Sequence, residues 1–332
     1  MNDLVGVIEK ELREVFQSRS IPLYRMMSYH LRLEDARGNI TTTVDRIWSH
    51  GLACLMVCRE LGGNIETLLP AAASLELTNG FNEIHEDIEN GTPSRDGQDA
   101  VWWVWGPAQA INAGDGMHAL ARLVMLKIQE RGSSADIAYK SIQVLDECSL
   151  SMSVGRFLDL EAQERIDIDV NSYLEMADGK TGSLYACAMK LGALIGKPDS
   201  PHVESLGLCG TNLGVAIQIS DDIRAIWGND ESDFDMNPEV LNKKKLLPVA
   251  YAIEVGDLKI KRRLGDIYFK RVLEQDDATA VREILDETGA KTFCENIVNQ
   301  KIEEANKAIE SFEREYGESN LVSDLLRYRN TK

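Results

Sequence analysis

Residues 85–90 read His85-Glu86-Asp87-Ile88-Glu89-Asn90, and they end a long pattern of apolar residues at helical spacing. One face of the expected helix is mainly apolar and advances in steps of three and four: Ala73, Leu77, Gly80, Ile84 and Asp87. A carboxylate that continues a core-facing stripe is costly to bury unless it binds a partner. The segment therefore predicts an acidic binding site at the end of a buried helix.

A second acidic segment further along the chain, Gln218-Ile219-Ser220-Asp221-Asp222, shows a similar arrangement. The helical face that it continues is again apolar: Val215, Ile219, Asp222 and Ile226. A solvated helix face would explain one acidic cluster, but two clusters that each end an apolar stripe favour a functional site. Carboxylates that face each other across a cavity can hold Mg²⁺, and Mg²⁺ can bind a diphosphate.

The composition limits the partners that this chain can bind. Its 332 residues are 44% hydrophobic, which is enough for a large core, and they carry a formal net charge of −18. A chain this acidic has no general attraction to nucleic acid or anionic lipid, so we expect no nucleic-acid partner. Any anionic substrate must be held by a local group of cations or by metal ions.

The sequence gives no sign of a membrane or secretory protein. The first residues lack the basic and apolar regions of a signal peptide, and no stretch reaches the roughly 20 apolar residues of a bilayer span. The six cysteines form no CxxC pair, which favours reduced thiols in the core. We therefore expect a cytoplasmic protein without integral membrane association.

The spacing of apolar residues is helical along nearly the whole chain, and strand-like alternation is scarce. Prolines and glycines mark likely breaks, for example in residues 90–99, 196–201 and 228–238. Neither a low-complexity linker nor an internal repeat divides the chain. The pattern predicts one all-α domain over residues 1–332.

Several segments together resemble the trans-isoprenyl diphosphate synthase (polyprenyl synthetase) family, from about Val44 to about Leu264. In chain order they are Glu86-Asp87-Ile88-Glu89-Asn90 with Arg95-Asp96-Gly97, then Gly179-Lys180-Thr181, then Gln218-Ile219-Ser220-Asp221-Asp222, then Lys243-Lys244-Lys245-Leu246-Leu247-Pro248. Each segment alone is a weak signal, but their order and spacing are specific. The resemblance implies the isoprenoid synthase fold, a single bundle of about ten or more helices around a central cavity, usually as a homodimer.

The resemblance also implies a Mg²⁺-dependent site for an allylic prenyl diphosphate, with three Mg²⁺ ions between the two acidic motifs. The implied metal ligands are Glu86, Asp87, Asn90, Asp221 and Asp222. The residues implied to hold the diphosphate are Arg95, Lys180, Gln218, Lys244 and Lys245, and the implied catalytic set is Asp87, Asp221, Asp222 and Lys180. Glu86 and Asn90 stand where the family motif DDxxD has aspartate, which predicts weaker or altered metal binding.

The family's second substrate, isopentenyl diphosphate, binds in a basic pocket without direct metal ligation, and this pocket looks depleted here. Asp45 and Trp48 stand where the family's GKRxRP motif has lysine and arginine. Asn79 stands where a binding histidine is expected, and Asp96 where the RRG motif has its second arginine. A charge pair at 4 Å is worth about 4 kcal/mol at an effective dielectric near 20, so reversing such a charge should repel a diphosphate.

These losses favour one hypothesis over two others. The favoured function is a class I terpene synthase, which ionises the allylic diphosphate and lets the cation cyclise or lose a proton without isopentenyl diphosphate. The first alternative is a prenyl diphosphate synthase or prenyltransferase that condenses the allylic diphosphate with isopentenyl diphosphate or another acceptor. The second is a non-catalytic partner subunit of a prenyl synthase.

Three residues are expected to line the cavity: Phe81, Trp48 and Asn79. Phe81 stands where the family places a floor that limits chain length, and core packing would explain it equally well. Trp48 could face a carbocation or pack in the core. We expect His85 to support the fold rather than to bind metal.

Overall fold

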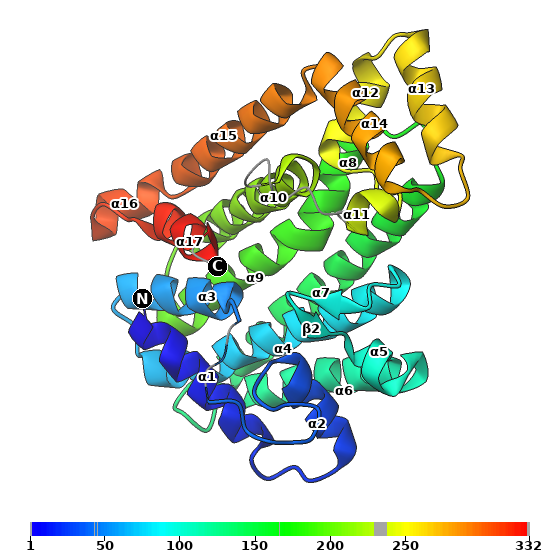
Figure 1. The fold of residues 1–332 in the computed structure, drawn as a ribbon. Helices are drawn as coiled ribbons and strands as arrows, with labels where there is room; N and C mark the ends of the chain where they lie inside the picture. The colour runs from blue at the N-terminus through cyan, green and yellow to red at the C-terminus, as the bar shows by residue number, and fades with distance from the viewer. Residues whose placement is uncertain (1, 43, 45, 166, 229–237, 331–332) are drawn as a thin grey trace. The chain divides into compact units, whose positions relative to one another are not determined.

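The computed structural model describes residues 2–42, 44, 46–165, 167–228 and 238–330, and α-helices dominate them (Figure 1). The chain divides into two compact units. The first contains Met1–Ser149, Leu184–Gly207 and Ile309–Lys332, and the second contains Leu150–Ser183 and Leu208–Ala308. The prediction of an all-α chain is confirmed, and a single domain over residues 1–332 stays a prediction.

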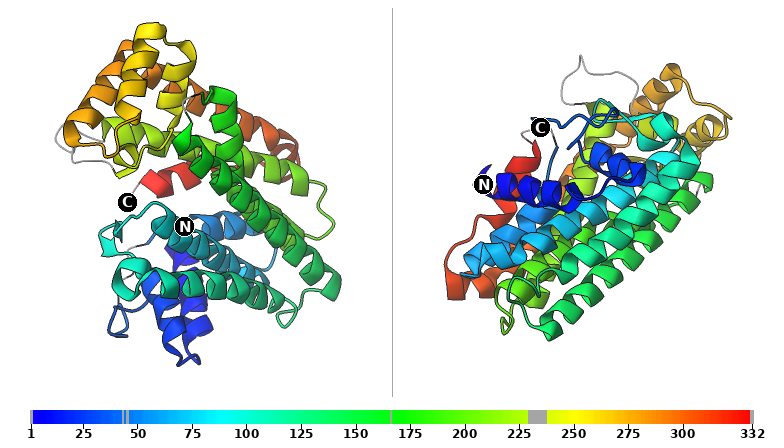
Figure 2. Two further views of the ribbon diagram at one scale, coloured as in Figure 1. Left: turned by 90° about the vertical axis from the view of Figure 1, so that its right-hand side faces the viewer. Right: turned by 90° about the horizontal axis from the view of Figure 1, so that it is seen from below.

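The first unit is built around the long helix α4 (Ile65–Glu89). Helices α1 (Asn2–Phe16), α3 (Ser49–Glu60) and α6 (Pro107–Leu126) pack against it. Helix α17 (Leu321–Asn330) packs against α3 although the two are far apart in the sequence (Figures 1 and 2). The other helices of this unit are α2 (Pro22–His30), α5 (Val101–Trp105) and α16 (Glu310–Tyr316). Three helices contribute residues to both units: α7 (Ala135–Glu164), α9 (Ser183–Gly196) and α10 (Val203–Trp227).

Two glycines allow α4 and α6 to approach each other closely. A Cβ atom on Gly80 would lie 2.6 Å from the sulfur of Met117, and one on Gly114 would lie 2.2 Å from Nε2 of His85. Real Cβ atoms do not approach other atoms so closely, so a larger residue at either position would require the Met117 or His85 side chain to move. His85 therefore packs against α6, as expected for a residue that supports the fold.

A short antiparallel hairpin of β1 (Ser94–Arg95) and β2 (Gln98–Asp99) follows α4. Its turn is formed by Asp96 and Gly97, whose φ angles are both positive at 49° and 78°. Two successive positive φ angles are typical of a type I′ turn, for which Asp-Gly is a favoured pair. Asp96 thus has a conformational role in the turn that follows Arg95.

The second unit contains a helical layer around two apolar clusters. Its further elements are α8 (Val170–Ala177), the π-helical turn η1 (Asp178–Gly182), α11 (Pro238–Leu241), α12 (Leu247–Val255), α13 (Leu258–Tyr268), α14 (Gln275–Glu287) and α15 (Ala290–Ala308). Helix α12 contacts α8, α13, α14 and α15, the last three of which are drawn in yellow to orange in Figure 2. A π-helical turn is rare and often marks a functional position.

All six cysteines lie in the described residues, are buried and form no disulfide, so the prediction of reduced core thiols is confirmed. Within the described ranges, no helix combines the length and the apolar character that crossing a bilayer requires.

Candidate active site

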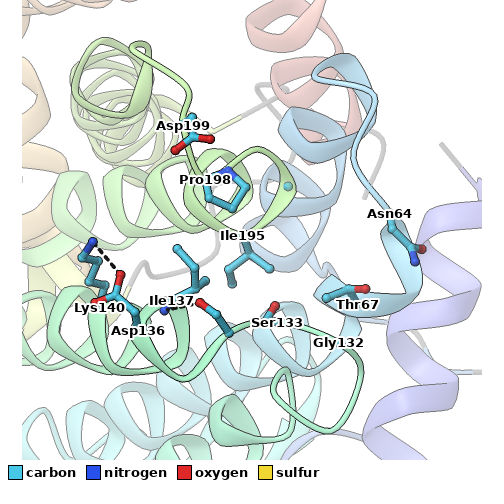
Figure 3. Close-up of a pocket in the computed structure, with 12 residues that line it drawn as sticks. Asn64, Thr67, Gly132, Ser133, Asp136, Ile137, Lys140, Ile195, Pro198 and Asp199 are labelled. Atoms are coloured by element: carbon cyan, nitrogen blue, oxygen red, sulfur yellow. Dashed lines mark hydrogen bonds and ion pairs between the residues drawn. The ribbon is translucent and has the colours of Figure 1, made fainter.

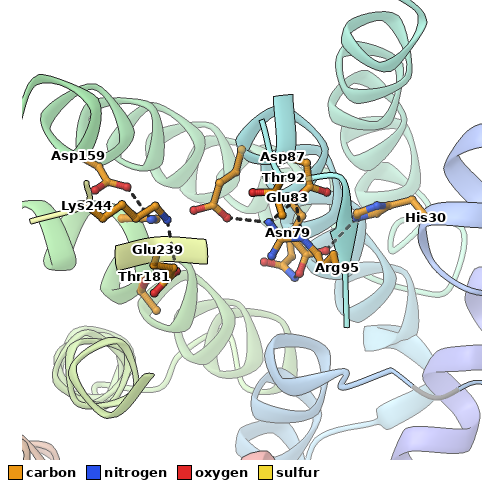
Figure 4. Close-up of polar contacts among 12 residues, drawn as sticks. His30, Asn79, Glu83, Asp87, Thr92, Arg95, Asp159, Thr181, Glu239 and Lys244 are labelled. Atoms are coloured by element: carbon orange, nitrogen blue, oxygen red, sulfur yellow. Dashed lines mark hydrogen bonds and ion pairs between the residues drawn. The ribbon is translucent and has the colours of Figure 1, made fainter. Parts of the chain in front are cut away.

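The first acidic cluster consists of Glu86 and Asp87 at the end of α4, which contact Arg95 on β1. Figure 4 shows Asp87 and Arg95 side by side. Arg95 donates to Oδ1 of Asp87 from Nε at 3.0 Å and from Nη2 at 2.8 Å, and to Oε2 of Glu86 from Nη2 at 3.0 Å. Asp87 is only 1% exposed, and its burial raises its pKa to about 6 although Arg95 opposes that rise. The Asp87 carboxylate is therefore mainly ionised near pH 7 and compensated by one guanidinium.

This cluster fits a magnesium ion. The second carboxylate oxygen of Asp87, Oδ2, is buried without a hydrogen-bond partner in the described structure. Such an orphaned oxygen is costly, and carboxylate oxygens are the protein ligands that Mg²⁺ prefers. Asn90 forms the C-cap of the same helix, and its backbone N–H donates to the carbonyl of Glu86 at 2.9 Å. Ligation by Glu86, Asp87 and Asn90 stays a prediction, and the orphaned oxygen supports it.

Phe81 and Trp48 are both packed among other side chains. The ring of Phe81 lies 4.6 Å from that of His118, measured between centroids. Trp48 is 1% exposed, and the guanidinium carbon of Arg46 lies 5.3 Å from its ring centroid. The cation that Trp48 faces here is thus an arginine, and a cavity-lining role for either residue stays a prediction.

Glu83 on α4 carries no role in the sequence-based predictions, yet it is the centre of a half-buried polar cluster (Figure 4). Its Oε2 accepts hydrogen bonds from Nη2 of Arg46 at 2.5 Å and from Nε2 of His30 at 2.9 Å, and its Oε1 accepts one from Nδ2 of Asn79 at 2.9 Å. We call these four residues the Glu83 cluster. One signal was present in the sequence, since Glu83 lies one helical turn from both Asn79 and Asp87.

A small pocket beside the Glu83 cluster is lined by side chains of both charges, among them His30, Arg32, Arg46, Arg95, Asp96 and Asp99. Arg32 donates to the backbone carbonyls of Arg95 at 3.1 Å and of Asp96 at 2.5 Å. Asp96 itself is exposed, and Asp45 lies outside the described residues. The pocket therefore contains basic residues, Arg32 and His30, that belong to none of the family motifs.

The two neighbouring aspartates of the second acidic cluster differ in their surroundings. The side chain of Asp221 is 31% exposed and accepts a hydrogen bond from Nη2 of Arg224 at 2.5 Å. Asp222 is fully buried; its Oδ1 accepts from Nε2 of Gln218 at 3.0 Å and its Oδ2 from the backbone N–H of Leu247 at 2.9 Å. Burial raises the pKa of Asp222 to about 7. Asp221 is thus the more accessible candidate for a metal ligand.

Asp222 also belongs to a chain of hydrogen bonds that joins three elements. The hydroxyl of Thr181 on η1 donates to Oε1 of Gln218 on α10 at 2.6 Å, and Gln218 donates in turn to Asp222. The chain ends at the backbone of Leu247, where α12 begins directly after Lys244 and Lys245. This network holds η1 and the start of α12 against α10, and so it positions Lys180 on η1 and the two lysines that precede α12.

Lys180 on η1 lies where two helices approach each other very closely. Its Nζ donates to Oδ2 of Asp159 on α7 at 2.8 Å, and the two side chains are only 10% and 13% exposed. A Cβ atom on Gly155 of α7 would lie 2.3 Å from the backbone nitrogen of Lys180. Asp159 and Gly155 were both missed from the sequence, because neither belongs to a motif.

The two lysines before α12 are also held by the protein. Nζ of Lys244 lies 3.3 Å from Oε1 of Glu239 (Figure 4), and Nζ of Lys245 donates to the carbonyl of Gln163 at 3.0 Å. Burial lowers the pKa of Lys245 to about 8. A diphosphate that binds these cations must therefore displace carboxylate and carbonyl partners, which favours a highly charged ligand.

Among the described residues, no group of three or more His, Cys, Asp and Glu side chains is arranged to hold a metal ion without further ligands. In the first unit, a metal ion held by Glu86 and Asp87 would therefore need further ligand oxygens. The same holds in the second unit for a metal ion held by Asp221. This requirement is typical of Mg²⁺, which usually binds through one or two carboxylates together with substrate phosphates.

Another pocket of the first unit shares none of these residues (Figure 3). Its lining includes Asn64, Thr67, Ile137, Ile195 and Asp199, and its lysine, Lys140, is paired with Asp136 at 2.8 Å. None of the predicted site residues line it, so it has no part in the chemistry considered below.

Comparison with known proteins identifies the family. The sequence profile of the family named polyprenyl synthetase matches residues 49–285. Geranylfarnesyl diphosphate synthase of Aeropyrum pernix is 31% identical over 279 residues, which cover 83% of this chain and 86% of that protein. Geranylgeranyl diphosphate synthase of Mycobacterium tuberculosis (strain H37Rv) is 29% identical over 243 residues, or 73% of this chain and 68% of that protein. A crystal structure of polyprenyl synthetase from Streptomyces coelicolor A3(2) superposes with a TM-score of 0.84 at 26% identity, covering 97% of this chain and 99% of that one.

The expectation of a class I terpene synthase is wrong, because these relatives are named as prenyl diphosphate synthases and not as terpene cyclases. The expectation rested on lost cations in residues 45–96 and did not count His30, Arg32 or the retained Arg46, which lie before the matched segment. The isoprenoid synthase fold is confirmed, and enzymes of this kind are generally Mg²⁺-dependent. This chain belongs to the polyprenyl synthetase family of trans-isoprenyl diphosphate synthases.

Proposed function

We propose that this chain is a prenyl diphosphate synthase that condenses an allylic prenyl diphosphate with isopentenyl diphosphate in the presence of Mg²⁺. The observation that carries the proposal is the presence of two separate groups of basic, hydrogen-bond-donating side chains. Lys180, Lys244 and Lys245 belong to the second unit, and His30, Arg32, Arg46 and Arg95 line a pocket of the first unit. A reaction between two diphosphates needs such a group for each of them.

The residues of the chain would bind and orient the two substrates. Magnesium, when bound, would supply positive charge to the diphosphate that leaves the allylic carbon. Lys180, Lys244 and Lys245 would hold the oxygens of that diphosphate. The close backbone contact of Gly155 on α7 with Lys180 on η1 would position Lys180. The allylic C–O bond breaks with its electron pair on the diphosphate, the double bond of isopentenyl diphosphate forms the new C–C bond, and a proton is released.

One assay tests this proposal. Purified protein would be incubated with Mg²⁺ and geranyl, farnesyl or geranylgeranyl diphosphate, with and without isopentenyl diphosphate. We expect longer prenyl diphosphates, identified by mass spectrometry, only when isopentenyl diphosphate is present. Hydrocarbons or alcohols from the allylic substrate alone would contradict the proposal, and the absence of any turnover would favour a non-catalytic partner subunit.

We also propose that the chain forms a homodimer through α6, and a single charge on this helix should disrupt it. Leu123 and Leu126, which are neighbours three residues apart on α6, are 61% and 45% exposed, and Ile111 near the start of the same helix is 46% exposed. Leu123→Asp should convert a dimer into a monomer with little change in unfolding free energy, as measured by light scattering and urea denaturation. Leu258→Asp, at an 87% exposed leucine of α13, is the control and should remain dimeric. A monomeric wild type, or a Leu123→Asp variant that stays dimeric, would refute the interface.

A further inference from the structure

In the Glu83 cluster, a carboxylate contacts two hydrogen-bond donors, Arg46 and His30, that an anionic acceptor would use. Both oxygens of Glu83 are engaged, one by Arg46 and His30 and the other by Asn79. An ionised carboxylate only accepts hydrogen bonds, so Nε2 of His30 carries the proton in this contact. Arg46 and His30 also line the small pocket beside the cluster. Glu83 thus holds two of the donors that the pocket offers.

Glu83 remains charged at neutral pH. Burial acts to raise its pKa, but Arg46, His30 and Arg95 more than offset this and hold the pKa well below its ordinary value. Burial lowers the pKa of His30, so its imidazole is neutral near pH 7. The pair of Arg46 and Glu83 therefore has no net charge, and the neutral His30 adds none.

The other two cations of the pocket, Arg95 and Arg32, also form hydrogen bonds with acceptors of the protein. Arg95 is bonded to Glu86 and Asp87, and Arg32 donates to two backbone carbonyls. Asp96 and Asp99 add further negative charge to the lining. An incoming dianion must therefore compete with carboxylates, and Glu83 directly contacts both Arg46 and His30.

We propose that Glu83 is a specificity-determining residue, a built-in anion whose contacts with Arg46 and His30 weaken the binding of the anionic acceptor at this pocket. The inference rests on the proposed function, in which that acceptor is isopentenyl diphosphate. Its physical basis is that a fixed negative charge repels a diphosphate at short range and also occupies the donors that the diphosphate needs.

The test is the substitution Glu83→Gln, which removes the charge and keeps the shape and an accepting oxygen. The KM for isopentenyl diphosphate should fall about tenfold, which corresponds to about 1.4 kcal/mol, while kcat and the KM for the allylic substrate change little. The Kd of isopentenyl diphosphate for the metal-free protein, measured by calorimetry, should fall by a similar factor.

The matched control is Glu11→Gln. Glu11 is a buried glutamate of the first unit, bonded to Nη2 of Arg131 at 2.7 and 2.8 Å, and it lies outside the pocket. This control should leave both constants unchanged, because loss of a buried ion pair alone does not alter acceptor binding.

The outcomes separate this inference from the proposed function. If the wild type elongates prenyl chains and Glu83→Gln leaves the acceptor KM and Kd unchanged or raises them, Glu83 is a structural ion-pair partner and the inference fails. If the wild type makes no elongated product but Glu83→Gln still tightens the binding of isopentenyl diphosphate, the inference stands and the proposed function fails.

Discussion

Replacing Asp221 by alanine should lower kcat by about a thousandfold and leave the melting temperature almost unchanged. The side chain of Asp221 is 31% exposed, and its partner Arg224 lies one turn away on the same helix. Exposed pairs of this kind contribute at most about 1 kcal/mol to stability. A lost metal ligand removes several kcal/mol of transition-state stabilisation, and about 4 kcal/mol corresponds to a thousandfold change in rate.

Asp222→Ala should behave differently, since it should lower both activity and stability. Asp222 is fully buried, and its removal leaves the backbone N–H of Leu247 and the amide of Gln218 without their acceptor. An unsatisfied buried donor costs about 1–3 kcal/mol, so we expect a loss of about 2–4 kcal/mol of unfolding free energy. Steady-state kinetics at saturating Mg²⁺ and urea denaturation would measure the two effects separately.

Asp324→Ala is the matched control for Asp221→Ala. Asp324 has a similar exposure of 28% and pairs with Arg327 at the same helical spacing, and it belongs to no acidic motif. This control should change neither activity nor stability. The assignment of Asp221 would be wrong if Asp221→Ala kept its activity within about tenfold of the wild type. A fully stable Asp222→Ala variant would contradict the supporting role of Asp222.

The contrast between Asp221 and Asp222 shows what the helical pattern could predict. The apolar stripe that contains Asp222 indicates a buried carboxylate, and the residue is indeed buried. The pattern could not identify its partner, because the N–H of Leu247 comes from the start of another helix. Long-range partners of this kind depend on tertiary packing and leave no periodic signal in the sequence.

The small pocket beside the Glu83 cluster shows where reasoning from motifs led to a wrong function. Motif positions such as Asn79 and Asp96 lack the expected donors, and from them the pocket seemed unable to bind an anion. His30 and Arg32 come from the region of α2, which no motif covers, and they line the same pocket as Arg46. The motifs therefore include neither Arg32 nor the hydrogen-bond donor His30, which the fold brings together with Arg46. Glu83, which pairs with His30 and Arg46, lies at no motif position either.

Gly155→Ala should lower the unfolding free energy by about 2–3 kcal/mol and reduce kcat by about a hundredfold. Alanine is the better helix former by about 1 kcal/mol, so local propensity alone would stabilise α7. The added Cβ atom, however, would lie 2.3 Å from the backbone nitrogen of Lys180 and 2.7 Å from the carbonyl carbon of Gly179. Backbone atoms cannot move aside as the end of a side chain can, and overpacking of this kind typically costs about 1–3 kcal/mol or more.

The loss of activity should follow from the displacement of η1, because a shift of about 1 Å in a positioning group can cost about a hundredfold in rate. Gly265→Ala on α13 separates this contact from the general effect of a helical glycine, since nothing lies within 4 Å of its Cβ position. That control should keep full activity and gain up to about 1 kcal/mol of stability. If Gly155→Ala and Gly265→Ala gave the same urea midpoint and the same kcat, the close contact between α7 and η1 would not be what places Lys180 and Thr181.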